Sequence, residues 1–298
     1  LLELINKFDP DIIHIHDYKH FPELYVLSKM IDLAKYNVVL TLHNVKLLLD
    51  CRRFTKIFYE LKLKQALRAF PKIIVVSDKV KNMVAPYIKN PLSIKVIGNG
   101  VETEFPKIAK TEFLHLLPVS EKAFQIISVG NLVHTKGFDI LIKAVASLNV
   151  EGYDVELSII GEGTERKKLE ELISQNNMQA KIRLLGRIDH DVVMNLYKYY
   201  NAFILPSWSE TFGIVYLEAM LNKIPVIGVK GEGIDGIVVD GVNGFLVKPK
   251  SVKNLIAKIR DIINSDNLSQ IIEVGYEEVI HHHLLKEVVS QIEEYYET

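Results

Sequence analysis

One pattern recurs along the chain: a short run of β-branched apolar residues, a turn, and a longer stretch with apolar residues at helical spacing. Continuous Ile and Val runs that alternate with helices indicate parallel strands buried on both faces. Right-handed crossovers between such strands give doubly wound α/β domains. The expected strands are Asp11–His16, Val38–His43, Ile73–Ser77 and Ile94–Ile97, then Gln125–Val129, Val155–Ile160, Ile182–Leu185, Ala202–Leu205, Val226–Val229 and Gly244–Val247.

Helical spacing fills most of the gaps between these strands. The expected helices are Phe54–Phe70, Lys79–Tyr87, Ile140–Leu148, Arg166–Ser174, Val192–Tyr199 and Leu255–Ile263. A last helix, Tyr276–Tyr296, has no strand after it, so we expect it to pack as an appendage. Packing of this helix back on the first domain is left open.

The repeating pattern breaks between about Thr103 and Ala123, where two prolines stand in a segment of mixed charge. We therefore predict a first domain at 1–104, a linker at 105–123, a second domain at 124–275 and a C-terminal helix at 276–298. Six strands make a full Rossmann-like sheet in the second domain. Four strands that start in mid-pattern would leave an apolar edge uncovered. The chain also begins without Met, so we expect the first domain to be incomplete, without its opening βα units.

Composition narrows the class of protein. Apolar residues make up 48% and charged residues 24% of the chain, which is typical of globular proteins. A net charge of −1 provides no general field that would attract nucleic acid or an anionic membrane. Cys51 is the single cysteine and cannot form an internal disulfide, and no stretch approaches the roughly 18 apolar residues of a membrane span. We expect a cytoplasmic protein, with peripheral contact at the inner face of the membrane left open.

Two glutamates carry the most informative chemistry. A strand ends at Leu205 and a helix is expected from about Phe212, where free N–H groups suit an anion such as a diphosphate. Glu210 precedes that helix and Glu218 lies inside it, so the two are separated by about 12 Å at most. Two carboxylates at this spacing could accept hydrogen bonds from hydroxyls at both ends of one nucleotide sugar. A helix cap and a surface glutamate are the ordinary alternative.

The surrounding residues resemble a known family. Glu210-x7-Glu218 inside Pro-Ser-x-x-Glu-x-Phe-Gly resembles the Glu-x7-Glu signature of retaining GT-B glycosyltransferases of family 4. Six further segments match the family in order, and the resemblance covers nearly the whole chain: Asp11–Asp17, Thr41–Asn44, Asn99–Val101, Val129–Leu132 through Lys136-Gly137, Gly231–Ile234 and Asp240–Val247.

The resemblance implies a fold and an activity. The fold is α/β, with two Rossmann-like doubly wound domains facing a cleft. The activity is retaining transfer of a hexose-type sugar from a nucleotide-diphosphate sugar to a glycan, lipid-linked or small-molecule acceptor. The nucleotide sugar is a substrate, and the resemblance implies no resident cofactor and no metal.

The resemblance also assigns donor-binding residues. Lys136 falls where the family neutralises the donor diphosphate, whose charge grows as the glycosidic bond breaks. Many members pair this lysine with an arginine at the position of Asn131, so either another cation substitutes here or diphosphate binding is weaker. Glu218 would hold the ribose hydroxyls, and Glu210 would face the donor sugar. Arg187 lies where the nucleobase pocket is expected, although a surface arginine is an equally good interpretation.

Further assignments fall on the phosphates and on the first domain. The backbone at Phe212 and Gly213 would meet phosphate. His43 ends a strand, where parallel sheets place their sites, and the family has a histidine there close to the reacting sugar. His16, on the neighbouring strand, and Asp17 after it are assigned to the acceptor side. With His14 and His43 they could in principle form a metal site, but buried strand histidines usually satisfy a hydrogen bond instead.

Other interpretations remain. Gly161-Glu162-Gly163 follows a strand as a dinucleotide fingerprint does, but Arg166 replaces the third glycine, so NAD is not expected. The segment from Gly130 to Gly137 lacks the second glycine and the Ser or Thr of a P-loop, so ATP is not expected either. A non-catalytic or split-enzyme subunit that binds a nucleotide sugar is the main alternative, and Asn131 favours it. A sugar-nucleotide epimerase is a weaker alternative.

Overall fold

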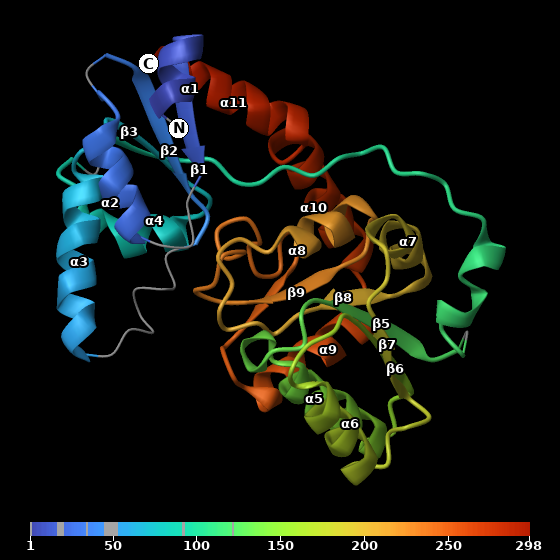
Figure 1. Cartoon of the computed structure of the whole chain (residues 1–298). Coiled ribbons are helices and arrows are strands. Elements are labelled where there is room, and N and C mark those ends of the chain that lie inside the picture. Colours follow the sequence, from blue (N-terminus) through green and yellow to red (C-terminus); the bar gives the residue numbers. More distant parts are fainter. Residues whose placement is uncertain (1, 17–20, 34, 45–52, 91–92, 121) are drawn as a thin grey trace. The chain divides into compact units, whose positions relative to one another are not determined.

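The computed structural model describes residues 2–16, 21–33, 35–44, 53–90, 93–120 and 122–298. Contacts divide the chain into two compact units (Figure 1). The first contains Leu1–Asn99 together with Lys286–Thr298, and the second is Gly100–Leu285.

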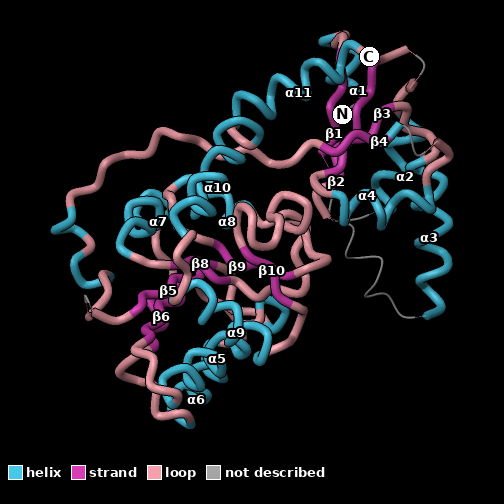
Figure 2. Tube along the Cα trace, turned by 180° about the vertical axis from the view of Figure 1, so that it is seen from behind, coloured by secondary structure: helices cyan, strands magenta, loops and turns pink. Residues whose placement is uncertain are grey.

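The first unit is an α/β unit with a parallel sheet in the order β1-β2-β3-β4. Continuous apolar residues make β2 and β3 almost fully buried, as strands covered on both faces require. Helices α2, α3 and α4 lie on one face of the sheet and α11 on the other (Figures 1 and 2). The elements are α1 (Leu2–Phe8), β1 (Ile12–His16), α2 (Phe21–Met30), β2 (Asn37–Leu42), α3 (Arg53–Leu67), β3 (Lys72–Val75), α4 (Asp78–Val84), β4 (Ile94–Val96) and α11 (Leu285–Glu297).

The C-terminal helix α11 packs on this first sheet. Val288 joins a buried cluster with Val39, Ile74 and Ile97. At the end of the helix the carbonyl of Tyr296 accepts hydrogen bonds from the side chains of Asn37 at 2.7 Å and Lys72 at 2.8 Å. These donors satisfy a helix C-terminus that would otherwise lack partners, and the lysine also complements its partial negative charge.

The second unit contains a parallel sheet in the order β10-β9-β8-β5-β6-β7. Counted within this unit, that is the Rossmann order, and all six predicted strands are present. Helices α5, α6 and α9 lie on one face and α7, α8 and α10 on the other (Figures 1 and 2). The elements are β5 (Phe124–Val129), α5 (Phe138–Val150), β6 (Val155–Ile160), α6 (Arg166–Gln175), β7 (Ile182–Gly186), α7 (His190–Leu196), β8 (Ala202–Ile204), α8 (Ile214–Leu221), β9 (Val226–Val229), β10 (Phe245–Val247), α9 (Val252–Ile263) and α10 (Leu268–His282).

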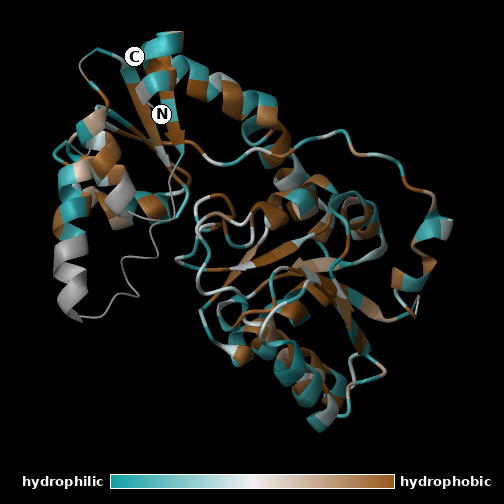
Figure 3. Ribbon diagram, in the orientation of Figure 1, coloured by the Kyte–Doolittle hydropathy of each residue, from teal (hydrophilic) through white to brown (hydrophobic). Residues whose placement is uncertain are grey.

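The hydropathy of the second unit follows its layers. The strands β8 and β10 are hydrophobic along their length, while α5 and α6 alternate hydrophilic and hydrophobic residues (Figure 3). Every residue of β6, β8, β9 and β10 is buried. The prediction of two α/β units with parallel sheets is therefore confirmed.

The single helix predicted at Tyr276–Tyr296 is two helices in the structure, α10 and α11. The chain leaves the helical conformation between them because its backbone bonds to another segment. The N–H of Val101 donates to the carbonyl of His283 at 2.9 Å, and the N–H of Leu285 donates to the carbonyl of Val101 at 2.9 Å. The break falls where the sequence offers no glycine or proline, so helical periodicity alone could not reveal it.

Of the helices that the structure describes, none combines the length and the hydrophobicity that a bilayer crossing requires.

Candidate functional site

Loops that follow β5 and β6 meet at the carboxyl edge of the six-stranded sheet. A Cβ atom on Gly161 would lie 2.0 Å from the carbonyl oxygen of Gly130, and one on Gly163 would lie 2.4 Å from that of Leu132. The two glycines therefore permit the β6 loop to pack directly on the β5 loop. This contact gives the Gly-Glu-Gly sequence a packing role.

The β5 loop is also joined to the loop after β8. The N–H of Trp208 donates to the carbonyl of Thr135 at 3.0 Å. Gly137 adopts a φ of 74°, and a Cβ there would lie 2.3 Å from the carbonyl oxygen of Pro206. Segments distant in sequence are thus held in contact by backbone groups, and the side chain of Lys136 is brought to the segment that carries Glu210.

Lys136 and Glu210 form an ion pair. Lys136 Nζ lies 2.5 Å from Glu210 Oε2, and the two side chains are only 20% and 13% exposed. The backbone N–H of Glu210 donates to a carboxylate oxygen of Glu232 at 2.7 Å, and its carbonyl accepts from the N–H of Gly233 at 3.0 Å. The loop after β9 therefore fixes the backbone of Glu210.

Helix α8 begins next to this pair. Its first residue is Ile214, two residues later than predicted, because Gly213 takes a left-handed φ of 86° and acts as the N-cap. Phe212 is buried, with 2% exposure. In the part of the chain that the structure describes, the N–H groups of Phe212 and Gly213 donate to no other group. Such unpaired donors at a helix N-terminus are suited to an anion.

Glu218, one turn further along α8, is a buried carboxylate with a partner on each oxygen. His190 Nε2 lies 3.0 Å from Oε1, and the hydroxyl of Tyr197 donates to Oε2 at 3.2 Å. Glu218 is 6% exposed and Tyr197 is fully buried. Burial, reinforced by the Glu218 carboxylate, raises the pKa of Tyr197 well above its ordinary value, so its hydroxyl remains a donor.

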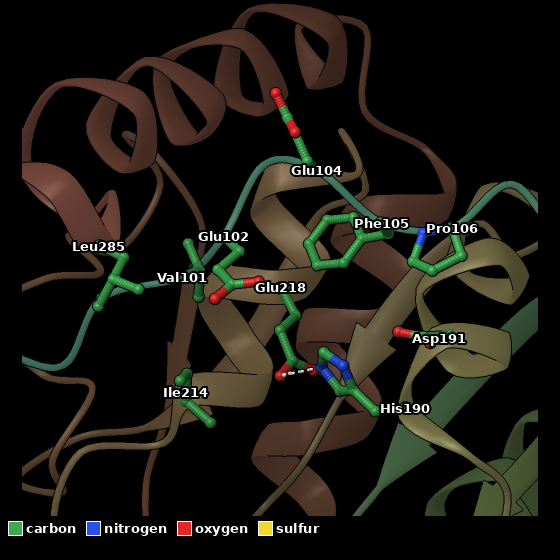
Figure 4. A pocket seen from close by; sticks show the side chains of 11 residues that line it. Val101, Glu102, Glu104, Phe105, Pro106, His190, Asp191, Ile214, Glu218 and Leu285 are labelled. Carbon is green, nitrogen blue, oxygen red and sulfur yellow. Dashed lines mark hydrogen bonds and ion pairs between the residues drawn. The ribbon is translucent and has the colours of Figure 1, made fainter.

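A cavity of about 370 Å³ opens beside Glu218 (Figure 4). It extends along α8 from Ile214 to Glu218, and the linker segment after Gly100 forms another wall. Figure 4 shows the hydrogen bond between His190 and Glu218 and shows the Glu104 carboxylate directed away from that pair. The described lining residues are Gly100, Val101, Glu102, Glu104, Phe105, Pro106, His190, Asp191, Ile214, Glu218 and Leu285.

Two predicted donor residues stand apart from this cavity. Arg187 follows β7 and Asn131 follows β5, and both are exposed. Neither belongs to the described lining of the cavity. Their assignments to the nucleobase and the diphosphate stay predictions.

The histidines of the first unit lie together. His16 Nδ1 lies 2.9 Å from His43 Nε2, and the rings stack with centroids 5.2 Å apart. His14 bonds to the hydroxyls of Thr41 at 2.7 Å and Tyr296 at 2.6 Å. Burial, with smaller contributions from His16 and His43, lowers the pKa of His14 to about 4. His14 is therefore neutral at physiological pH and serves a structural role.

Asp17, the other acceptor-side residue, lies outside the described residues. Among the residues that are described, no group of three or more His, Cys, Asp or Glu side chains is placed to hold a metal ion.

Sequence reasoning did not identify three residues of the site. His190 and Tyr197 hold Glu218, and Glu232 holds the backbone of Glu210. Each reaches its partner across 21 to 28 residues of sequence. A signal was available for His190, which begins the helix after β7, close to the carboxyl edge where such sheets place their sites.

Comparisons with known proteins give a consistent family. Residues 110–277 match the sequence model described as Glycosyl transferases group 1, and residues 1–105 match the one described as Glycosyltransferase Family 4. An uncharacterized glycosyltransferase of Methanocaldococcus jannaschii is 32% identical over 254 residues, which cover 85% of this chain. The chain spans 66% of the length of that relative and 64% of a second one from the same organism.

Solved structures show the same fold. The sucrose-phosphate synthase of Thermosynechococcus elongatus superposes with a TM-score of 0.82 at 21% identity, covering 99% of this chain and 75% of its own. HepE of Anabaena, solved in complex with UDP, superposes with a TM-score of 0.82 at 22% identity, covering 98% of this chain and 80% of its own.

Proposed function

This chain belongs to the glycosyl transferases group 1 family, and from that membership we propose that it transfers a hexose-type sugar from a nucleoside-diphosphate sugar, with retention of configuration. The acceptor is a glycan, a lipid-linked molecule or a small molecule. The observation that carries the proposal is that Lys136 pairs with Glu210 beside the start of α8, and that Ile214 and Glu218 of the same helix line a cavity.

The charges support one orientation of the donor. The described lining of the cavity contains the carboxylates of Glu102, Glu104, Asp191 and Glu218 and no lysine or arginine. Carboxylates repel a diphosphate but accept hydrogen bonds from ribose hydroxyls and base N–H groups. The nucleoside end of the donor therefore belongs in the cavity. The diphosphate belongs beside Lys136 and the free N–H groups at Phe212 and Gly213.

The ion pair between Lys136 and Glu210 implies that Lys136 changes partners when the donor binds. As the diphosphate enters, Lys136 passes from the Glu210 carboxylate to the phosphate oxygens. Glu210 then faces the sugar and accepts hydrogen bonds from its hydroxyls. When the glycosidic bond breaks, Lys136 compensates the charge that grows on the leaving diphosphate, which stabilises the transition state more than the ground state.

The first unit is proposed to serve the acceptor through His16 and Asp17 and to supply His43 as a catalytic residue close to the reacting sugar. The hydrogen bond and stacking between His16 and His43 support this role because they fix the ring of His43. Retention rests on the Glu210-x7-Glu218 signature and is checked directly by NMR of the anomeric proton in the first product formed.

Calorimetric titration with UDP, GDP and ADP tests the donor site. UDP comes first, because HepE of Anabaena was solved with it. Binding of one of these by the wild-type chain, weakened at least tenfold in Lys136→Ala, is the expected result. Lys143→Ala is the matched control, since Lys143 forms an exposed pair with Asp139 on α5. If the folded protein binds none of the three nucleotides, the proposal fails.

Turnover separates an enzyme from a binding subunit. Asn131 is exposed and supplies no second cation, which favours a chain that binds donor but transfers slowly without a partner. Release of nucleoside diphosphate from the matching nucleotide sugar, abolished in Glu210→Ala, supports the enzyme. Tight donor binding with no release supports the non-catalytic subunit.

A further inference from the structure

His190 holds the carboxylate that the proposed function assigns to the ribose, and it does so from the wall of the cavity. We propose that His190 is a positioning residue for Glu218, and that through Glu218 it makes the site prefer ribonucleoside over 2′-deoxyribonucleoside diphosphates. The inference rests on the proposed function, because it takes the nucleoside end of a donor as the occupant of the cavity.

The first argument comes from the lone pairs of Glu218. An ionised carboxylate has about four acceptor sites, and its terminal torsion is broad when nothing restrains it. His190 uses one site on Oε1 at 3.0 Å, and Tyr197 uses one on Oε2 at 3.2 Å. One donor on each oxygen fixes the plane of the carboxylate. Two acceptor sites remain, one on each oxygen, which is the number that the two hydroxyls of a ribose cis-diol require.

The two donors are not equivalent. Tyr197 is fully buried and does not line the cavity, whereas the side chain of His190 is 58% exposed and does. Tyr197 therefore anchors the carboxylate from the protein interior. His190 is the donor that a bound nucleoside meets, and its loss would release Glu218 on the side where the ligand lies.

The chemistry of the imidazole fixes its role. An ionised carboxylate only accepts hydrogen bonds, so His190 Nε2 must carry the proton. The ring of Phe105 packs edge-on against the imidazole, with centroids 6.1 Å apart at 69°, and holds its orientation. Of the side chains that the structure describes in the cavity lining, only that of His190 can donate a hydrogen bond to an ionised Glu218.

The test compares each nucleoside diphosphate with its 2′-deoxy counterpart, using whichever of UDP, GDP and ADP binds. Hydrogen bonds to a charged group contribute about 1.5–3 kcal/mol, so the wild-type protein should prefer the ribonucleotide by roughly 10- to 100-fold. His190→Ala should reduce that preference to below about fivefold. His190→Gln should keep most of it, because its amide N–H can donate to Glu218.

Two controls identify the route of the effect. Lys143→Ala changes a residue of α5 outside the described lining of the cavity and should leave the preference unchanged. In a Glu218→Ala background, His190→Ala should cause no further loss, since a positioning residue has nothing left to position. The preference is a ratio measured on one protein, so a partly unfolded variant does not distort it.

The outcomes separate the two proposals. A wild-type preference that persists in His190→Ala, or equal binding of the ribo and 2′-deoxy forms by the wild type, overturns the inference and leaves the proposed function standing. Absence of nucleoside diphosphate binding to the wild type overturns both. A loss of preference in His190→Ala with recovery in His190→Gln supports the inference.

Discussion

Lys136 and Glu210 stand 74 residues apart in sequence, yet their charged groups lie 2.5 Å apart in a largely buried ion pair. The family resemblance assigns these two side chains to different parts of one donor molecule. In the structure they neutralise each other. Under the proposed function, a donor breaks this pair as Lys136 passes to the diphosphate.

Glu210→Gln should tighten nucleoside diphosphate binding while it lowers sugar transfer. The amide does not compete for Lys136 as a carboxylate does, so the lysine becomes available to the diphosphate. An ion pair of this kind contributes up to about 1 kcal/mol, which corresponds to a roughly three- to fivefold lower Kd in calorimetry. Glu165→Gln, which removes the partner of the exposed Lys168, is the control. Weaker binding by Glu210→Gln would contradict the change of partners by Lys136.

Gly137→Ala should destabilise the second unit. Gly137 combines a φ of 74° with a Cβ position 2.3 Å from the carbonyl oxygen of Pro206. The substitution adds a steric clash to backbone strain, and we expect a loss of about 3 kcal/mol or more in the free energy of unfolding by urea. Gly152→Ala is a matched control, because Gly152 has a φ of 94° and a Cβ added there would have no atom within 4 Å. It should cost only the strain, about 1 kcal/mol. Equal losses in the two variants would show that the contact at Pro206 is not tight.

Tyr197→Phe should lower stability without opening the cavity. The substitution removes the buried donor to Glu218 Oε2 and leaves a buried carboxylate with one hydrogen bond fewer. A loss of about 1–3 kcal/mol in the free energy of unfolding is expected. Tyr153→Phe serves as the control, because the structure shows no hydrogen bond from the Tyr153 hydroxyl to any described residue. A change within about 0.5 kcal/mol for Tyr197→Phe would argue against a hydrogen bond of consequence.

The first unit should lose stability as the pH falls from about 6.5 to about 4. Burial lowers the pKa of His14 to about 4 in the folded chain, against 6.5 for an unperturbed histidine. Between these values the unfolded state binds more protons than the folded state, so stability rises with pH in this window. Urea midpoints measured from about pH 4 to about pH 7 should therefore slope upward in the wild type. The slope should be smaller in His14→Gln, and an identical slope would exclude His14 as its source.

Much of this molecule follows from local patterns in the sequence. Runs of Ile and Val that alternate with amphipathic stretches predict the ten strands and most of the helices. The runs predict strands because a strand that is buried on both faces consists mainly of apolar residues. The Glu210-x7-Glu218 spacing predicts that one carboxylate lies just before α8 and the other inside it. These features depend on neighbours within a few residues, and so one chain is enough to reveal them.

Tertiary structure decided the rest. The break between α10 and α11 depends on backbone hydrogen bonds to Val101, and no residue type at the break predicts these bonds. The hydrogen bonds of His190 and Tyr197 to Glu218 depend on how α7 and the turn after it pack against α8. Helical period and residue type report which face of an element is apolar, but they carry no information about which polar groups meet across two elements. A polar contact between distant segments depends on the packing of everything between them, and it exists only once the chain has folded.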